Sequence, residues 1–75
     1  MGTDDLTPIQ QVALEIVKEI TDSKAGMIPR MAHMTEMRRV ANEKILAALR
    51  ELYRMRLVSV SLDINKNPMF AINDP

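Results

Sequence analysis

Arginines and lysines are the side chains of this sequence whose types and spacing indicate a chemistry, and that chemistry is the binding of a polyanion. Nine bases and four acids lie in residues 24–66, a net charge of +5, whereas residues 1–23 hold one base and five acids, a net charge of −4. The basic segment can form one electropositive face even though the whole chain is neutral. A solvated surface of mixed charge is the alternative interpretation.

Arg50 and Arg54 lie four residues apart in a segment that is expected to be helical. If the apolar residues of this helix point inward, a rotation of 100° per residue places both arginines on the opposite face. Such a face suits the major groove of DNA, where arginine pairs with guanine. Glu43 and Glu51 lie on or beside it and would repel phosphate, so a solvated helix face competes with this interpretation. The residues expected to point inward are Ile45, Leu49 and Leu52.

His33 is the only histidine of the chain, and there is no cysteine. A metal centre or a nucleophile–base pair needs partner residues, and the neighbours of His33 form no ligand set. We therefore expect His33 to be a partly buried structural residue. The acids form no obvious pair for acid–base chemistry, and Gly2 and Gly26 are too few for a phosphate-binding loop. No catalytic residue, metal ligand or cofactor site is expected, and we do not expect an enzyme.

The elements that position these side chains belong to one small domain, residues 1–75, with a disordered N-terminal tail at 1–6 and a C-terminal tail at 73–75. The hydrophobic content of 47% is too high for a disordered chain. No apolar run approaches the roughly 20 residues of a membrane helix. The acidic start does not resemble a signal peptide, so a cytoplasmic location is expected, with no membrane partner.

The first helix has a clear start signal in Thr7-Pro8-Ile9-Gln10, which is typical of a capping box with proline at the first helical position. Apolar residues then follow at steps of three and four, and Gly26 suits a left-handed position just past the helix end. Residues 27–29 are expected to be a short extended connector from which Ile28 packs into the core. Pro29 favours this extended geometry.

Residues 30–56 contain no glycine or proline and are helical by composition. We favour two helices, at 30–37 and 42–55, with Asn42 as the N-cap of the second. One continuous helix with a near-heptad apolar seam is the alternative, but Arg38 interrupts that seam. After these helices, residues 58–64 alternate between apolar and polar side chains, residues 65–68 are typical of a turn, and residues 69–72 form the return strand. The expected fold class is α+β and mainly helical, with three helices followed by a C-terminal two-stranded β-hairpin.

The order of these elements, and above all the stretch from Ile45 to Val58, resembles the winged-helix family of helix-turn-helix domains. The resemblance implies a DNA-binding module, such as a small transcriptional regulator, with 42–55 as the recognition helix and 65–68 as the wing. Arg56 departs from the glycine that the family often has there, and residues 38–41 depart from its usual small or polar turn. The DNA-binding residues expected on this basis are Arg30, Arg38, Arg39, Asn42, Lys44, Arg50, Arg54 and Lys66.

Leu46 and Tyr53 lie roughly 90° from the core direction of the same helix. They widen its apolar face and are candidates for a homodimer or protein interface, which is attractive for so small a domain. The alternative function is therefore protein–protein interaction or dimerisation by a winged-helix-like fold that does not bind nucleic acid. No small-molecule ligand is indicated.

Overall fold

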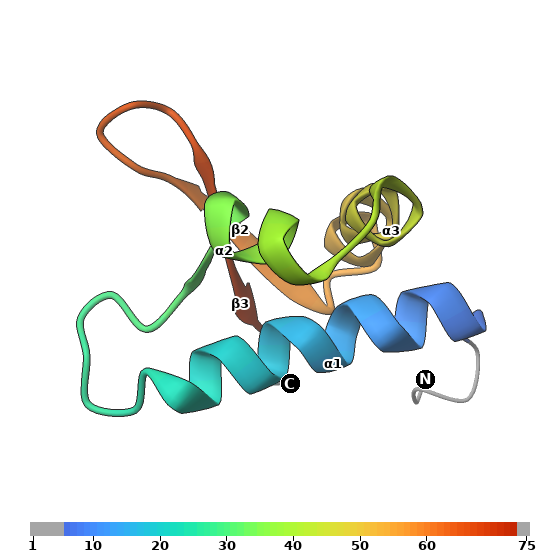
Figure 1. Cartoon of the computed structure of the whole chain (residues 1–75), viewed down its shortest axis with the longest axis horizontal. Coiled ribbons are helices and arrows are strands. Elements are labelled where there is room, and N and C mark those ends of the chain that lie inside the picture. Colours follow the sequence, from blue (N-terminus) through green and yellow to red (C-terminus); the bar gives the residue numbers. More distant parts are fainter. Residues whose placement is uncertain (1–5, 74–75) are drawn as a thin grey trace.

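The computed structural model describes residues 6–73 as three helices and a three-stranded antiparallel sheet (Figure 1). About half of the chain is helical, so the expected α+β class is confirmed. No helix within the described range is long and apolar enough to cross a membrane. The elements in chain order are α1 (Pro8–Ser23), β1 (Ala32–His33), α2 (Met34–Val40), α3 (Glu43–Arg54), β2 (Val58–Leu62) and β3 (Pro68–Ile72).

The two predicted tails fall largely outside this range, since residues 1–5 and 74–75 are not described. Leu6, which the N-terminal tail was expected to include, is buried in the core with 6% of its surface exposed. At the other end, the backbone N–H of Asn73 donates to the Leu57 carbonyl over 3.0 Å. Both residues are therefore held by the domain.

The sheet corrects the expectation of a two-stranded hairpin, because β1 pairs with β3 and makes a third strand. The strand order is β1-β3-β2, with Ala32 opposite Phe70 and His33 opposite Met69. A strand of two residues is too short to display the alternation that reveals longer strands. The expectation that Ile28 packs into the core is also wrong, because Ile28 is 99% exposed and Ala32 is fully buried instead.

The local signals of α1 are confirmed. The Thr7 hydroxyl accepts from the backbone N–H of Gln10, and the Gln10 side chain accepts from the N–H of Thr7. These bonds satisfy amide groups that have no partner within the helix. Gly26 has a φ of +86°, the left-handed conformation that was expected past the helix end.

The two-helix interpretation of residues 30–56 is also confirmed, with different bounds. α2 ends at Val40 and α3 begins at Glu43. The Asn42 side-chain oxygen accepts from the backbone N–H of Ile45 over 2.9 Å, as expected for an N-cap. α2 begins later than predicted because His33 belongs to β1 and caps the helix from there.

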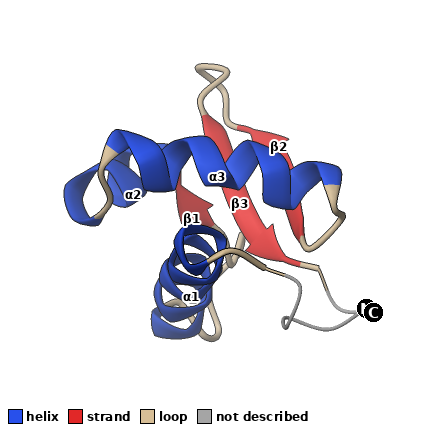
Figure 2. Ribbon diagram, turned by 90° about the vertical axis from the view of Figure 1, so that its right-hand side faces the viewer, coloured by secondary structure: helices blue, strands red, loops and turns tan. Residues whose placement is uncertain are grey.

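The core lies where α1, α3 and the sheet meet, and every element contributes to it (Figure 2). Leu49 and Leu52 are buried as expected, whereas Ile45 is only partly buried. On the flank of α3, Leu46 is partly buried and Tyr53 is 53% exposed. The buried apolar residues of the described range are Leu6, Ala13, Val17, Ala32, Met37, Ala48, Leu49, Leu52, Val58 and Phe70.

Arg56, between α3 and β2, has a φ of 64°, in the left-handed region that favours glycine. The substitution Arg56→Gly is expected to raise the free energy of unfolding by about 0.5–1 kcal/mol, because relief of the Cβ–backbone contact exceeds the added entropy of the unfolded chain. Denaturant unfolding measures this change. Arg54→Gly, inside α3, is the control and should lower the same free energy by about 1 kcal/mol. A less stable Arg56→Gly protein would contradict the expectation.

Candidate nucleic-acid interface

α2, α3 and the tip of the β2–β3 hairpin lie on the side of the molecule away from α1 (Figures 1 and 2). These elements carry most of the bases that the sequence singled out. The predicted residues found on them, or at the junction between them, are all exposed: Arg38, Arg39, Asn42, Lys44, Arg50, Arg54 and Lys66.

α3 presents Arg50 and Arg54 to solvent because Ala48, Leu49 and Leu52 occupy its buried face. The two arginines are separated by one helical turn and share one exposed surface. Glu51, which was expected to repel phosphate beside them, accepts a hydrogen bond from the Gln10 side chain of α1.

The end of α2 supplies Arg38 and Arg39, and its buried residue Met37 fixes the orientation of this last turn. Arg38 comes four residues after Met34 and lies on the same side of the helix. Asn42 follows immediately, but its side-chain oxygen is already used in the N-cap of α3. Asn42 therefore has a structural role that any substitution there would disturb.

The hairpin tip that carries Lys66 is organised by Asp63. The Asp63 Oδ1 atom accepts from the backbone N–H groups of Asn65 and Asn67, each over 2.8 Å. Lys66 lies between them with a φ of 65° and an exposed side chain. The predicted turn is confirmed with different bounds. Asp63 and Ile64, which were expected in the strand, lie beyond the end of β2, whereas Pro68, which was expected in the turn, begins β3.

His33 joins this tip to the start of α2. Its Nδ1 accepts from the backbone N–H of Thr35 over 3.1 Å, so the ring proton is on Nε2 and is donated to Asp63 Oδ2 over 2.6 Å. The histidine side chain is 25% exposed. His33 is thus a partly buried structural residue, as expected, and it connects α2 with the hairpin.

Two carboxyl groups of this region have lowered pKa values. The hydrogen bond from His33 lowers the pKa of Asp63, and the backbone N–H groups of Asn67 and Asn65 lower it further. The Lys24 ammonium, which donates to Glu36, lowers the pKa of that carboxyl, and the backbone N–H of His33 adds to the effect. Both carboxylates are stabilised in their charged form by hydrogen bonds within the fold.

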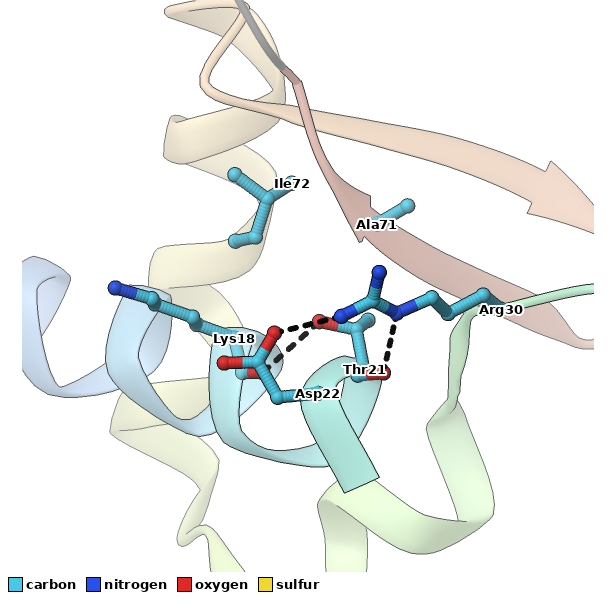
Figure 3. Close-up of a pocket in the computed structure, with 6 residues that line it drawn as sticks. All are labelled: Lys18, Thr21, Asp22, Arg30, Ala71 and Ile72. Atoms are coloured by element: carbon cyan, nitrogen blue, oxygen red, sulfur yellow. Dashed lines mark hydrogen bonds and ion pairs between the residues drawn. The ribbon is translucent and has the colours of Figure 1, made fainter. Parts of the chain in front are cut away.

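Arg30 lies apart from the other predicted residues, at the C-terminal end of α1 (Figure 3). Its Nε donates to the Thr21 carbonyl over 2.8 Å and its guanidinium pairs with Asp22 over 2.9 Å. Lys18 and Ile72 line the same shallow pocket, whose volume is about 340 Å³. Arg30 therefore fixes the loop after α1 rather than joining the surface of α2 and α3.

Within the described range, most acids of residues 24–66 have hydrogen-bond partners, whereas most of the bases have none. The acids Glu36, Glu51 and Asp63 all accept hydrogen bonds from other side chains, and Glu43 alone has no such partner. Of the bases, Lys24 and Arg30 are in ion pairs. The bases whose side chains have no ion pair or hydrogen bond within residues 6–73 are Arg38, Arg39, Lys44, Arg50, Arg54, Arg56 and Lys66.

Sequence reasoning missed two parts of this site. Arg56 was considered only as a departure from the family's glycine, yet it is an exposed base that follows directly on α3. The hydrogen bond between His33 and Asp63 spans 30 residues, and no local pattern indicates it. The alternation of residues 58–64 was the one available signal, because Asp63 is the only charged residue within it and lies next to the predicted turn.

An apolar groove of about 440 Å³ separates α3 from the hairpin. Leu46 and Tyr53, the two candidate interface residues, line it from α3. Val60 and Leu62 line it from β2, and Leu62 is 60% exposed. The structure thus brings the candidate interface residues together with exposed apolar residues of the hairpin.

No group of three or more metal-ligating side chains exists within the described residues. No family model, no curated protein and no solved structure matches this chain.

The lowered pKa of Asp63 predicts how stability depends on pH. The folded state holds the proton of Asp63 less tightly than the unfolded state, where a carboxyl has a pKa of about 3.9. The stabilisation is present above that value and is lost as the pH falls through the lower folded pKa. Asp63→Asn should therefore flatten the fall in unfolding free energy at acidic pH, measured by denaturant unfolding over a pH series. Glu19→Gln, on α1, is the control and should leave the decrease of unfolding free energy at acidic pH as steep as in the wild type. An equally steep decrease in Asp63→Asn would contradict the role of Asp63.

Proposed function

We propose that this chain is a DNA-binding module of the winged-helix class, and that the surface formed by α2, α3 and the hairpin tip is its DNA interface. The observation that carries the proposal is that most acids of residues 24–66 have internal partners, whereas most bases of this segment have none. Three of the four acids accept internal hydrogen bonds, which hold their carboxylates in place without removing their charge. Seven exposed bases have no partner in the described residues and outnumber these four acids. A surface with a surplus of free cations attracts the phosphate backbone.

The order of the elements supports the same proposal. A helix, a short strand, two helices and a hairpin follow one another, and the short strand joins the hairpin in one sheet. α3 precedes the hairpin and exposes a face that carries Arg50 and Arg54. In the resemblance stated above, this helix is the recognition helix and the hairpin is the wing.

Six of the seven free bases have a defined part in this proposal. Arg50 and Arg54 face the major groove, where the guanidinium donates to guanine O6 and N7. Lys66 contacts the duplex from the hairpin tip, whose conformation Asp63 maintains. The phosphate contacts, which position the domain without reading sequence, come from Arg38, Arg39 and Lys44.

DNA binding should be measured by fluorescence anisotropy of a labelled random-sequence duplex at several salt concentrations. About three to four phosphate contacts, from Arg38, Arg39, Lys44 and Lys66, predict that the logarithm of the association constant falls with that of the salt concentration with a slope of roughly −3 to −4. The variant Arg50→Gln/Arg54→Gln should raise the Kd by about tenfold or more. Lys18→Gln, which removes a base from α1, is the matched control and should have little effect. Absence of binding at low salt, or equal loss in both variants, would exclude this interface.

The apolar groove between α3 and the hairpin favours a second candidate function, protein–protein interaction or dimerisation. Tyr53 and Leu62 are both more than half exposed on its walls. DNA offers little apolar surface to cover such residues, whereas aromatic and arginine side chains are typical of protein interfaces. Arg50 lines the same groove, so the two candidate functions use one surface.

Sedimentation velocity over a wide concentration range tests the dimer. If the groove is the dimer interface, the protein should sediment as a dimer at high concentration and Tyr53→Glu should shift it to the monomer, because a buried unpaired carboxylate is costly. Tyr53→Phe preserves the ring and should leave the dimer intact. A wild-type protein that stays monomeric at every concentration and binds duplex DNA would remove this candidate.

A further inference from the structure

β2 is an edge strand without the features that normally protect such strands. The order β1-β3-β2 leaves one side of β2 unpaired within the described residues. Its sequence, Val-Ser-Val-Ser-Leu, has no charge and no proline, and its pairing with β3 runs without a bulge from Val58 to Leu62. An edge strand of this kind is a template for a further strand.

The hydrogen bonds that border β2 show which backbone groups face outward. The N–H of Asn73 donates to the Leu57 carbonyl over 3.0 Å, and the N–H of Asp63 donates to the Asn67 carbonyl over 2.9 Å. Residues of an antiparallel strand alternate between bonding inward and outward, so Ser59 and Ser61 bond to β3. The amide and carbonyl groups that face away from β3 therefore belong to Val58, Val60 and Leu62. Val58 is only 1% exposed, so the accessible outward groups are those of Val60 and Leu62.

A groove of about 520 Å³ runs beside this edge. Val58 and Val60 form one wall, and Tyr53 and Arg54, from the last turn of α3, form the other. Figure 2 shows α3 crossing the sheet and ending beyond β2, so the helix end covers one face of the space next to the strand. The outward backbone groups of Val60, which lines the groove, thus face the space beside this edge.

The charged side chains beside the groove indicate which kind of partner strand would bind there. Arg54 and Arg56 line it, their side chains have no ion pair within residues 6–73, and no carboxylate lines it. An entering strand with carboxylates would pair with both arginines, and its apolar side chains would cover Tyr53 and Val60. Two-fold pairing of β2 with β2 of a second copy would bring both α3 ends to one face of the sheet and place like charges together, which disfavours a second copy.

We propose that the free edge of β2 binds an extended acidic segment of a partner protein as a fourth strand of the sheet. The main-chain groups of Val60 and Leu62 supply the hydrogen bonds, and Arg54 and Arg56 select carboxylate side chains. This mode of recognition combines sequence-independent backbone bonding with side-chain selectivity. The proposal does not depend on DNA binding, because the backbone groups and Arg56 are not part of the proposed DNA interface; Arg54 is the one residue that both proposals use.

The test is an NMR titration of the ¹⁵N-labelled full chain with a capped hexapeptide in which valine and glutamate alternate. The amide resonances of Val58, Val60 and Leu62 should shift, and the accessible amides of Val60 and Leu62 should become protected from hydrogen exchange. A peptide with lysine in place of glutamate should bind at least about fivefold more weakly. The valine–glutamate peptide with N-methyl groups at alternate amides, which cannot pair on one edge, should cause no shift.

Two variants separate the backbone and charge contributions. Val60→Pro removes an outward N–H without removing a bond to β3 and should weaken peptide binding about fivefold or more. Arg56→Gly retains the fold and should weaken it about two- to fivefold, while Arg39→Gln on α2 is the matched control and should leave it unchanged. If Val60→Pro fails to fold, the N-methylated peptide on the wild-type chain tests the same bonds.

Four results would overturn the proposal. The first is the absence of any shift at millimolar peptide, and the second is equal binding of the lysine peptide. The third is a shift of the three amides with protein concentration alone, which would assign the edge to a second copy. The fourth is a shift of these amides by duplex DNA with none by the peptide, which would assign Arg54 and Arg56 to nucleic acid.

Discussion

Burial of Leu49 and Leu52 in the core shared by α1, α3 and the sheet is the interaction on which the rest of the molecule depends. A chain of 75 residues buries few large side chains, and full burial of each leucine contributes about 1.5–3 kcal/mol. These two residues fix the rotation of α3 about its own axis. That rotation directs Arg50 and Arg54 outward and turns Leu46 and Tyr53 toward the hairpin.

The electrostatics of the surface follow from this packing. With α3 held against α1, Glu51 meets Gln10, and with α2 held at the end of β1, Glu36 meets Lys24. Glu36, Glu51 and Asp63 thus stabilise contacts between elements, while the bases of α2, α3 and the hairpin form no ion pair within the described residues. A chain with no net charge thereby presents a cationic surface, which net charge alone does not reveal.

The hairpin is held at two places with different consequences. At its tip, Asp63 closes the turn and accepts from His33, so the position of Lys66 depends on the start of α2. Along β2 the pairing is one-sided, because β3 lies between β1 and β2. The same sheet therefore has a tip that is held by side-chain hydrogen bonds and an outer edge that is unpaired within the described residues.

The sequence by itself determined the features that depend on neighbouring residues. Thr7 and Gln10 cap α1, Asn42 caps α3, Gly26 adopts a left-handed conformation and Val58–Leu62 forms a strand, because a cap, a turn or a two-residue period involves only a few consecutive positions. The outward direction of Arg50 and Arg54 was likewise predictable from helical periodicity.

The tertiary structure alone decided what depends on residues far apart in the chain. β1 exists because Ala32 meets Phe70, and His33 is fixed because it meets Asp63. Three further features also depend on residues far apart in the chain: the exposure of Ile28, the ion pair of Arg30 with Asp22 and the unpaired outer edge of β2. Each feature is set by packing between elements. Contacts between distant residues produce no periodic pattern in the sequence, so a local pattern cannot predict them.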